Sequence, residues 1–220
     1  MNLREKVRGG RNFSKNYYRG LKSTYFDYRI NKIPLFWDWK ISKILLYCNG
    51  GKVLDIGCAF GYFLDRLPNS FEKFGIDISS FAINEAKKRF NYEFFVWDIK
   101  EPFNYKDLDL VTAFDCIEHI SELEHSLNNI MSMLKKDGIF VMGVPLKGSL
   151  SATRDPTHIH ILSKYEWIKI LELTEFEVLD TYSKFAVGTL FVCQKIHQQP
   201  ASSNFKKTNE LRVDEYAKSA

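Results

Sequence analysis

The sequence predicts an α/β fold with a mostly parallel sheet of seven strands, helices on both faces and one antiparallel strand near the C-terminus. Two observations predict it. From residue 51 onward, short apolar runs rich in β-branched residues alternate with segments whose apolar residues recur at helical spacing, which is typical of strands joined by crossover helices. The last two apolar runs lie close enough together to form a hairpin, which makes one of them antiparallel to the other strands.

Five strands and three helices are expected in the first part of this alternating region. The strands are Lys52–Ile56, Lys73–Ile78, Glu93–Trp97, Leu108–Phe114 and Ile139–Val144. The helices between them are Tyr62–Leu67, Phe81–Phe90 and Ser121–Leu134. Ser79 or Ser80 is a suitable N-cap for the second helix, and Asp137-Gly138 is expected to end the third. A further helix, over Trp37–Leu46, is expected to lead into the first strand.

The pattern changes after the fifth strand. Residues Lys147–Ile161 contain two Ser, two Thr and two His and are expected to form a polar loop. Ser163 is then a suitable N-cap for a helix over Lys164–Leu173. The hairpin strands are expected at Glu177–Tyr182 and Thr189–Ile196.

The 220 residues suit one domain with terminal extensions. We expect an aromatic-rich, basic arm over residues 1–40, a folded domain over 41–196 and a polar, flexible tail over 197–220. The net charge of +4 is uneven, because Met1–Lys22 has seven basic side chains against one acidic, and with +1 in the tail this leaves −3 for residues 23–196. The arm either packs on the domain or closes over a cleft as a lid. Its charge either contacts phosphate or nucleic acid, or is simply solvated.

Several classes of protein are excluded or disfavoured. The four cysteines form no Cys-x-x-Cys pair and no Cys/His series with zinc-site spacing, so neither a zinc finger nor a redox motif is indicated. No stretch approaches the roughly 20 apolar residues of a membrane helix. The basic N-terminus is not followed by the apolar segment of a secretory signal. We therefore expect a cytoplasmic protein that does not insert into membranes.

A glycine-containing loop follows the first strand, in the sequence VLDIGCAFGYF at residues 53–63. Gly57 directly follows the strand, where the absence of a Cβ lets the backbone approach a ligand. The helix that begins after Gly61 adds backbone N–H donors. The spacing Asp-x-Gly-x-x-x-Gly differs from the Gly-x-Gly-x-x-Gly of dinucleotide-binding loops, which disfavours a NAD-dependent dehydrogenase.

Acidic residues end the next two strands. Asp77 is placed to accept hydrogen bonds from both hydroxyls of a ribose, and Asp98 from the exocyclic amine of an adenine. Because the carboxyl ends of parallel strands share one edge of the sheet, these acids and the glycine loop predict a cleft for an adenosyl group.

In this order the motifs resemble those of the class I S-adenosylmethionine-dependent methyltransferases, whose sheet is Rossmann-like. VLDIGCAFGYF resembles their first motif, GIDIS the second and FVWDI the third, and LDLVTAFDCIEHI is similar to the segment around their fourth strand. The segment from Ile117 to Gly138 and the stretch Asp155–Ile159 resemble the ubiquinone-biosynthesis and small-molecule branch. The resemblance covers Lys52–Ile196, and Ala59 stands where a glycine is frequent.

The resemblance implies an enzyme that uses S-adenosyl-L-methionine as its cofactor and transfers the cofactor's methyl group. It implies that Asp55 and the glycine loop hold the methionine part. It further implies that Asp77 binds the ribose and that Phe114 flanks the cofactor on the substrate side. The full set of expected cofactor-binding residues is Asp55, Gly57, Cys58, Ala59, Gly61, Asp77, Ile78, Asp98, Ile99 and Phe114.

Methyl transfer from a sulfonium is an in-line displacement with a neutral thioether as leaving group, so alignment and exclusion of water contribute much of the catalysis. A base is needed only when the acceptor is an alcohol, a phenol or a protonated amine. His119, after the fourth strand, is the candidate base, and Glu118 is the candidate carboxylate that orients it. Alternatively, His119 is a structural residue of the turn.

Substrate contacts are expected from two other segments. Asp155, His158 and His160 lie in the polar loop, and if that segment is extended the two imidazoles point the same way. These three residues line the substrate pocket or anchor the loop. A divalent metal on them is a further possibility, but we expect no metal. Tyr18 and Tyr25 would line the pocket if the arm closes as a lid.

We expect a small-molecule acceptor and no nucleic-acid partner, because the strong positive charge is confined to the arm. No Asn/Asp-Pro-Pro-Tyr/Phe motif follows the fourth strand, which also disfavours base methylation. An RNA- or protein-directed methyltransferase is the first alternative, and a non-catalytic cofactor-binding or scaffold protein is the second. The sequence leaves the acceptor and the oligomeric state open.

Overall fold

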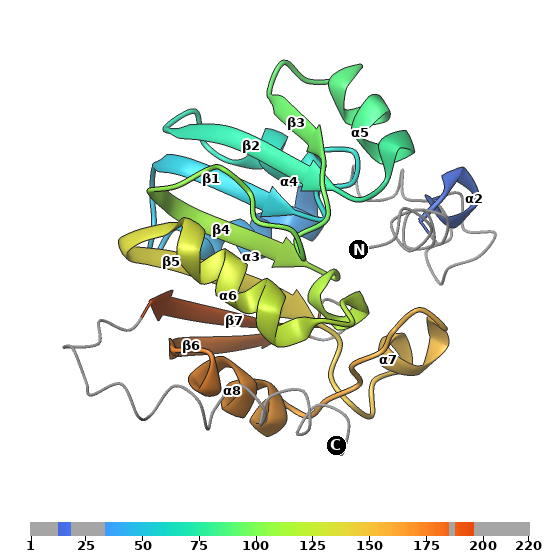
Figure 1. The fold of residues 1–220 in the computed structure, drawn as a ribbon, viewed down its shortest axis with the longest axis vertical. Helices are drawn as coiled ribbons and strands as arrows, with labels where there is room; N and C mark the ends of the chain where they lie inside the picture. Colours follow the sequence, from blue (N-terminus) through green and yellow to red (C-terminus); the bar gives the residue numbers. More distant parts are fainter. Residues whose placement is uncertain (1–12, 19–33, 185–187, 196–220) are drawn as a thin grey trace.

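The computed structural model describes residues 13–18, 34–184 and 188–195. Its centre is a seven-stranded sheet with the order β3-β2-β1-β4-β5-β7-β6 (Figure 1). The strands are β1 (Gly51–Ile56), β2 (Phe71–Asp77), β3 (Glu93–Val96), β4 (Leu108–Phe114), β5 (Leu134–Val144), β6 (Phe176–Lys184) and β7 (Gly188–Lys195).

The strand directions confirm the predicted fold class. β1 pairs in parallel with β2 and β4, and the ladder continues in parallel from β2 to β3 and from β4 to β5. β7 pairs antiparallel with both β5 and β6. Among the described strands, β7 is therefore the one that runs against the other six. The hairpin of β6 and β7 closes one edge of the sheet, and β3 forms the other edge.

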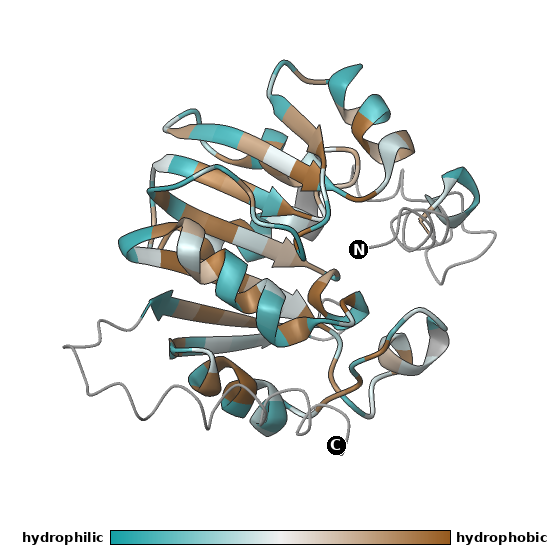
Figure 2. Cartoon of the chain, viewed as in Figure 1, coloured by the Kyte–Doolittle hydropathy of each residue, from teal (hydrophilic) through white to brown (hydrophobic). Residues whose placement is uncertain are grey.

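Helices cover both faces of the sheet, and each face has its own hydrophobic core. One core joins the sheet to α6 (Leu123–Met133) and α8 (Lys164–Leu173). The other joins it to α3 (Pro34–Ile44), α4 (Tyr62–Arg66) and α5 (Ser80–Lys87). In Figure 2 the central strands are largely brown, whereas the helices alternate between brown and teal along their length. This two-sided burial explains why the central strands are apolar runs rather than alternating patterns.

Two helix starts follow the sequence rules closely. The Ser79 hydroxyl accepts a hydrogen bond from the Ala82 N–H at 3.3 Å and caps α5. At α8, the Ser163 hydroxyl accepts from the Glu166 N–H at 3.3 Å, and the Glu166 carboxylate accepts from the Ser163 N–H at 2.6 Å. This reciprocal pair is a capping box, and it satisfies two N–H groups that a helix start leaves open.

Two predictions, one of a helix end and one of a loop, need correction. The helix after β4 ends at Met133, and β5 begins at once, so the residues expected to end the helix lie inside the strand, with Asp137 at a φ of 60°. The segment expected to be a polar loop contains a short helix, α7 (Leu150–Arg154), capped by the Ser149 hydroxyl. Five residues are too few for an apolar periodicity to show, so the sequence pattern did not reveal α7.

One edge of the sheet gathers the segments that matter for function. Beyond the carboxyl ends of β1, β2 and β4 lie the short helices η2 (Ile117–His119), α7 and α2 (Lys15–Tyr18) (Figure 1). Tyr25 and the predicted tail over 197–220 lie outside the described residues. Within the part of the chain that the structure describes, no helix has both the length and the apolar character to cross a membrane.

Candidate active site

The glycine loop after β1 is built from left-handed backbone. Gly57, Ala59 and Gly61 have φ angles of 70°, 48° and 78°. A Cβ on Gly57 would lie 2.7 Å from the Cys116 sulfur, and a Cβ on Gly61 would lie 2.8 Å from Cζ of Phe94. Both positions therefore require glycine for conformation and for space.

Backbone hydrogen bonds hold this loop against the end of β2. The N–H groups of Gly57 and Cys58 both donate to the Ile76 carbonyl, at 2.8 and 3.0 Å. The Gly61 N–H donates to the Cys58 carbonyl at 2.9 Å. The Ala59 N–H donates to the Asp77 carboxylate at 3.0 Å. Alanine tolerates the left-handed conformation poorly, and this bond to a carboxylate helps to keep it there.

Asp77, the strand-end acid that the sequence analysis singled out, is buried and accepts several hydrogen bonds. Its carboxylate also accepts from the Ser79 N–H at 2.8 Å and from the Tyr18 hydroxyl, 3.4 Å from each oxygen. Burial raises the pKa of Asp77 to about 6, although the backbone hydrogen bonds and Tyr18 favour the charged form. The Tyr18 hydroxyl is thus bonded to the same carboxylate that the family resemblance assigns to the ribose of the cofactor.

The other expected cofactor residues differ in exposure and packing. Asp55 is buried within β1 and accepts from the Thr112 hydroxyl at 2.7 Å, and burial raises its pKa to about 7. It therefore anchors β1 to β4 beneath the loop. Asp98 accepts from the Lys100 N–H at 3.1 Å. The next residue, Ile99, is buried, whereas Ile78 after β2 is half-buried.

Phe114 packs into the core beneath α3 rather than standing at an open edge. Its ring centroid lies 4.8 Å from that of Phe63 and 5.9 Å from that of Trp37. The Nζ of Lys40 lies 4.3 Å from the Phe114 ring centroid and 3.7 Å from a carboxylate oxygen of Asp115. The sequence prediction missed this ion pair between a buried lysine and a half-buried aspartate, although Asp115 follows a strand just as Asp98 does. Burial lowers the pKa of Lys40, and the nearby Asp115 opposes that shift.

Glu118, His119 and His158 lie together beyond β4. Glu118 is fully buried, with one carboxylate oxygen 3.7 Å from Nε2 of His158, and the imidazoles of His119 and His158 have centroids 4.7 Å apart. The backbone N–H groups of Ile159 and His160 both donate to the Glu118 carbonyl, at 2.9 and 3.1 Å, which binds the two segments to each other. Burial raises the pKa of Glu118 well above its ordinary value, and the nearby Asp115 adds to this.

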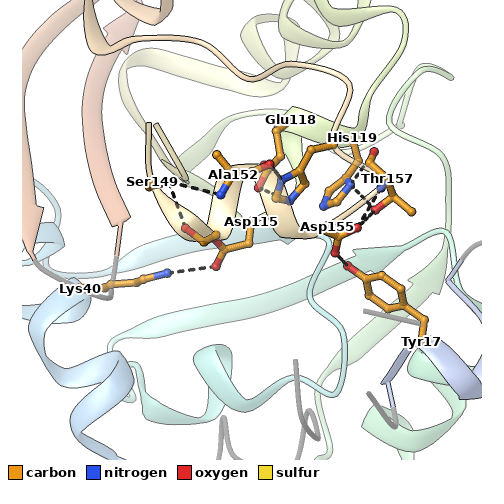
Figure 3. Close-up of polar contacts among 11 residues, drawn as sticks. Tyr17, Lys40, Asp115, Glu118, His119, Ser149, Ala152, Asp155 and Thr157 are labelled. Carbon is orange, nitrogen blue, oxygen red and sulfur yellow. Dashed lines mark hydrogen bonds and ion pairs between the residues drawn. The ribbon is translucent and has the colours of Figure 1, made fainter. Parts of the chain in front are cut away.

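His119 is held by the segment that precedes His158. Its Nδ1 lies 3.1 Å from the carbonyl oxygen and 3.0 Å from the hydroxyl of Thr157. That hydroxyl donates to Asp155 at 2.5 Å, and Asp155 also accepts from the Tyr17 hydroxyl at 3.3 Å (Figure 3). Because a carbonyl oxygen only accepts, Nδ1 of His119 carries a proton and Nε2 keeps its lone pair. Burial lowers the pKa of His119, and the nearby His158 lowers it further, so the imidazole is neutral at neutral pH.

His160 is separated from this cluster. Its Nε2 lies 2.8 Å from the Ile120 carbonyl oxygen, whereas Nδ1 of His158 lies 2.9 Å from the Ala152 carbonyl oxygen. The expectation that the two imidazoles point the same way is therefore corrected, because each is held by a different backbone carbonyl. His160 anchors the loop, and His158 faces Glu118.

The short helix α2 lies across the edge. Tyr18 reaches Asp77 on one side, and Tyr17 reaches Asp155 on the other. The ring of Phe13 packs edge-on against His119, with centroids 5.4 Å apart. Asp155, Thr157 and Tyr17 act through contacts between distant segments. Thr157 carried no sequence signal of its own, whereas the stretch around Asp155 resembles a family segment and Tyr17 belongs to the aromatic-rich arm.

The fold and the edge together define a class of protein. Residues 32–181 match the family model described as a methyltransferase domain, and the chain belongs to that family. The predicted resemblance to the class I S-adenosylmethionine-dependent methyltransferases is confirmed. Membership of this family implies S-adenosylmethionine as the cofactor.

A relative in Mycolicibacterium smegmatis, which bears the name of an S-adenosylmethionine-dependent methyltransferase, is 27% identical over 145 residues. The match covers 63% of this chain and 56% of that protein, and the chain spans little more than half the length of the curated relatives it matches.

Two solved structures share the fold. The methyltransferase in a complex with the Haloferax volcanii Trm112 methyltransferase activator has a TM-score of 0.64 and 19% identity, covering 78% of this chain and 95% of that one. The [4+2]-cyclase SpnF has a TM-score of 0.61 and 18% identity, covering 72% of this chain and 80% of that one. Because a cyclase shares the fold, the fold alone does not determine which reaction the site performs.

Proposed function

We propose that this protein transfers a methyl group from S-adenosylmethionine to a small-molecule acceptor bound beside His119. Binding of the cofactor is supported mainly by one observation: the Asp77 carboxylate links the glycine loop to the end of β2. Two backbone N–H groups already bond to it, and one hydroxyl shares it. A ribose offers two hydroxyls to such a group. The proposed cofactor site consists of Gly57, Ala59, Gly61, Asp77 and Asp98.

The surroundings of His119 support a small acceptor. Its imidazole is covered by Phe13 and backed by His158, and Tyr17 bonds to Asp155 beside it. Such partly apolar surroundings suit a small molecule, and keeping water away from the methyl group prevents its hydrolysis. Residues 23–196 carry a net charge of −3, which gives a nucleic-acid backbone little to bind. Asp155 and His158 lie on the methyl-acceptor side of the proposed site, where Asp155 holds the segment around Thr157 in place.

α2 acts as a lid in this proposal. Tyr18 contacts Asp77, the proposed partner of the ribose, and Tyr17 contacts Asp155 on the side of the methyl acceptor. Cofactor entry requires the Tyr18 hydroxyl to give up Asp77, and reclosure would shield the methyl group from water.

A turnover assay tests the proposed function. The full chain is incubated with S-adenosylmethionine and a panel of phenols, carboxylates and amines, with short RNAs and peptides as separate arms, and S-adenosylhomocysteine is quantified by mass spectrometry. We expect turnover in a small-molecule arm and its loss in Asp77→Asn. Asp180→Asn is the matched control, because Asp180 lies on β6, the outermost strand on the side of the sheet away from β2 and Asp77. Turnover confined to RNA or peptide would contradict the small-molecule proposal, and cofactor binding without turnover in any arm would favour a scaffold.

A further inference from the structure

We propose that Glu118, His119 and His158 form a binding site for a divalent transition-metal ion. Each of the three residues offers one ligand atom, and these atoms lie within 4.8 Å of one another. Two ligands bonded to one ion at about 2.1 Å lie at most about 4.2 Å apart. A movement of less than about 1 Å would therefore bring the three donors onto one ion.

The Glu118 carboxyl is the strongest sign of a missing ligand. It is fully buried, and neither of its oxygens has a hydrogen-bond partner among the described residues. Burying polar oxygens without partners is costly, and native proteins rarely leave them so. Protonation would remove the charge but would leave a hydroxyl and a carbonyl oxygen unsatisfied. A cation bound to the carboxylate resolves both problems.

Backbone contacts hold both imidazoles in the tautomer that a metal ligand needs. Nδ1 of His119 faces the Thr157 carbonyl oxygen, and Nδ1 of His158 faces the Ala152 carbonyl oxygen, at 3.1 and 2.9 Å. Because these oxygens only accept, each Nδ1 carries the proton and each Nε2 keeps its lone pair. Metal-binding histidines are typically held in this way, with the ring nitrogen that does not bind the metal donating to a carbonyl or carboxylate.

The supporting contacts extend one step further. The Thr157 hydroxyl accepts from His119 and donates to Asp155, which also accepts from the Thr157 N–H at 2.9 Å. Ala152, whose carbonyl holds His158, lies in α7 and is buried. α7 and Asp155 therefore serve as the frame that fixes both rings. Asp155 is a positioning residue in this arrangement rather than a ligand.

The donor set selects the kind of ion. Two imidazole nitrogens and one carboxylate oxygen suit Mn²⁺, Fe²⁺, Co²⁺ or Zn²⁺, whereas Mg²⁺ and Ca²⁺ prefer sites made of oxygen. Three protein ligands also leave positions open for a substrate. This inference replaces the sequence-based expectation of no metal, which considered Asp155, His158 and His160 together.

The inference deepens the proposed function, on which its catalytic consequence rests. An open position would take an acceptor hydroxyl as a further ligand and lower its pKa. The hydroxyl proton would leave to solvent water before α2 closes, and the oxygen lone pair would then form the bond to the methyl carbon. The carbon–sulfur bond breaks with its electron pair staying on sulfur, which yields the neutral thioether. The acceptor class that fits such a site is an alcohol, a phenol or a carboxylic acid.

Cobalt binding provides the test, because ligation of Co²⁺ by nitrogen and oxygen donors is visible in its absorption spectrum. Full-length protein freed of metal by chelation and dialysis is titrated with Co²⁺, and Zn²⁺ is then added as a competitor. We expect one Co²⁺ per chain, displaced by Zn²⁺. Glu118→Gln and His158→Ala should each weaken binding by at least about tenfold. His125→Ala is the matched control, because that histidine is exposed on α6, and it should bind as the wild type does.

The outcomes separate the two proposals. A wild type that shows no saturable Co²⁺ band, or variants that bind as tightly as the wild type, would overturn the metal site. The second variant keeps the test decisive if Glu118→Gln does not fold. S-adenosylmethionine binding is measured on the same samples by calorimetry. Cofactor binding without Co²⁺ binding would refute the metal site alone, and Co²⁺ binding without cofactor binding would refute the proposed function alone.

Discussion

Ala59 shows how a single residue can depart from its family and keep the geometry. It has a left-handed φ of 48° at a position where class I methyltransferases frequently carry glycine, and its N–H donates to Asp77. The loop conformation therefore does not depend on the residue type at this position alone. At Gly57 and Gly61, by contrast, both the conformation and the neighbouring side chains exclude a Cβ.

Two substitutions in this loop should have opposite effects on the free energy of unfolding. Ala59→Gly removes left-handed strain of about 1–2 kcal/mol, offset by the greater entropy of glycine in the unfolded chain, so stability should rise slightly or stay unchanged. Gly61→Ala adds that strain and places a Cβ 2.8 Å from the Phe94 ring, so stability should fall by more than about 1 kcal/mol. Urea unfolding measures both, and equal losses in the two variants would contradict the described loop.

Asp55 should make stability depend on pH. Burial raises its pKa to about 7 in the folded protein, above its unfolded value, so the folded state binds the proton more tightly. Its stabilising contribution is complete below about pH 4 and is lost as the pH rises through about 7. Asp77 should act in the same direction through about pH 6.

The test for Asp55 compares urea unfolding of the wild type and Asp55→Asn at about pH 5 and about pH 7. The asparagine keeps an oxygen for the Thr112 hydroxyl and does not titrate. We expect the drop in stability from pH 5 to pH 7 to be smaller in the variant. A drop of the same size in both proteins would mean that Asp55 has an ordinary pKa.

At the scale of the elements, α2 is the piece whose position could not be read from the sequence. Its four residues have no periodic pattern, and they are placed by two long-range hydrogen bonds, from Tyr17 to Asp155 and from Tyr18 to Asp77. The same limit applies to α7. The start of α5, in contrast, is set by Ser79, which lies next to the helix in sequence and was one of the two predicted caps.

Removing the Tyr18 hydroxyl should strengthen cofactor binding. Tyr18→Phe keeps the ring against Phe60 but frees the Asp77 carboxylate from a partner that the ribose would have to displace. A hydrogen bond to a charged group is worth about 1.5–3 kcal/mol at good geometry, and at 3.4 Å we expect less, a decrease in Kd of up to about tenfold.

Calorimetry with S-adenosylmethionine measures this change. Tyr105→Phe is the control, because that hydroxyl bonds to Glu93 on β3. Weaker binding by Tyr18→Phe would show that the hydroxyl contacts the bound cofactor instead of competing with it.

At the scale of the whole molecule, local signals were sufficient for the sheet and for half of the site. The central strands were predictable because burial on both faces makes β4 and the second half of β5 nearly continuous apolar runs. Asp77 and the glycine loop were predictable because a strand end and a glycine are features of a few adjacent residues. Lys40 and Thr157 were not, because their roles depend on Asp115 and His119, which the fold brings to them from other segments.

The central claim is that the edge formed by the glycine loop and Asp77 binds S-adenosylmethionine. Isothermal titration of the full chain with this cofactor tests it most directly, with Asp77→Asn as the variant and Asp180→Asn as the control. The account predicts saturable binding to the wild type and to the control, and a Kd at least about tenfold higher for Asp77→Asn, since two ribose hydroxyls lose a charged acceptor. Unchanged affinity in Asp77→Asn, with a circular dichroism spectrum like that of the wild type, would contradict it.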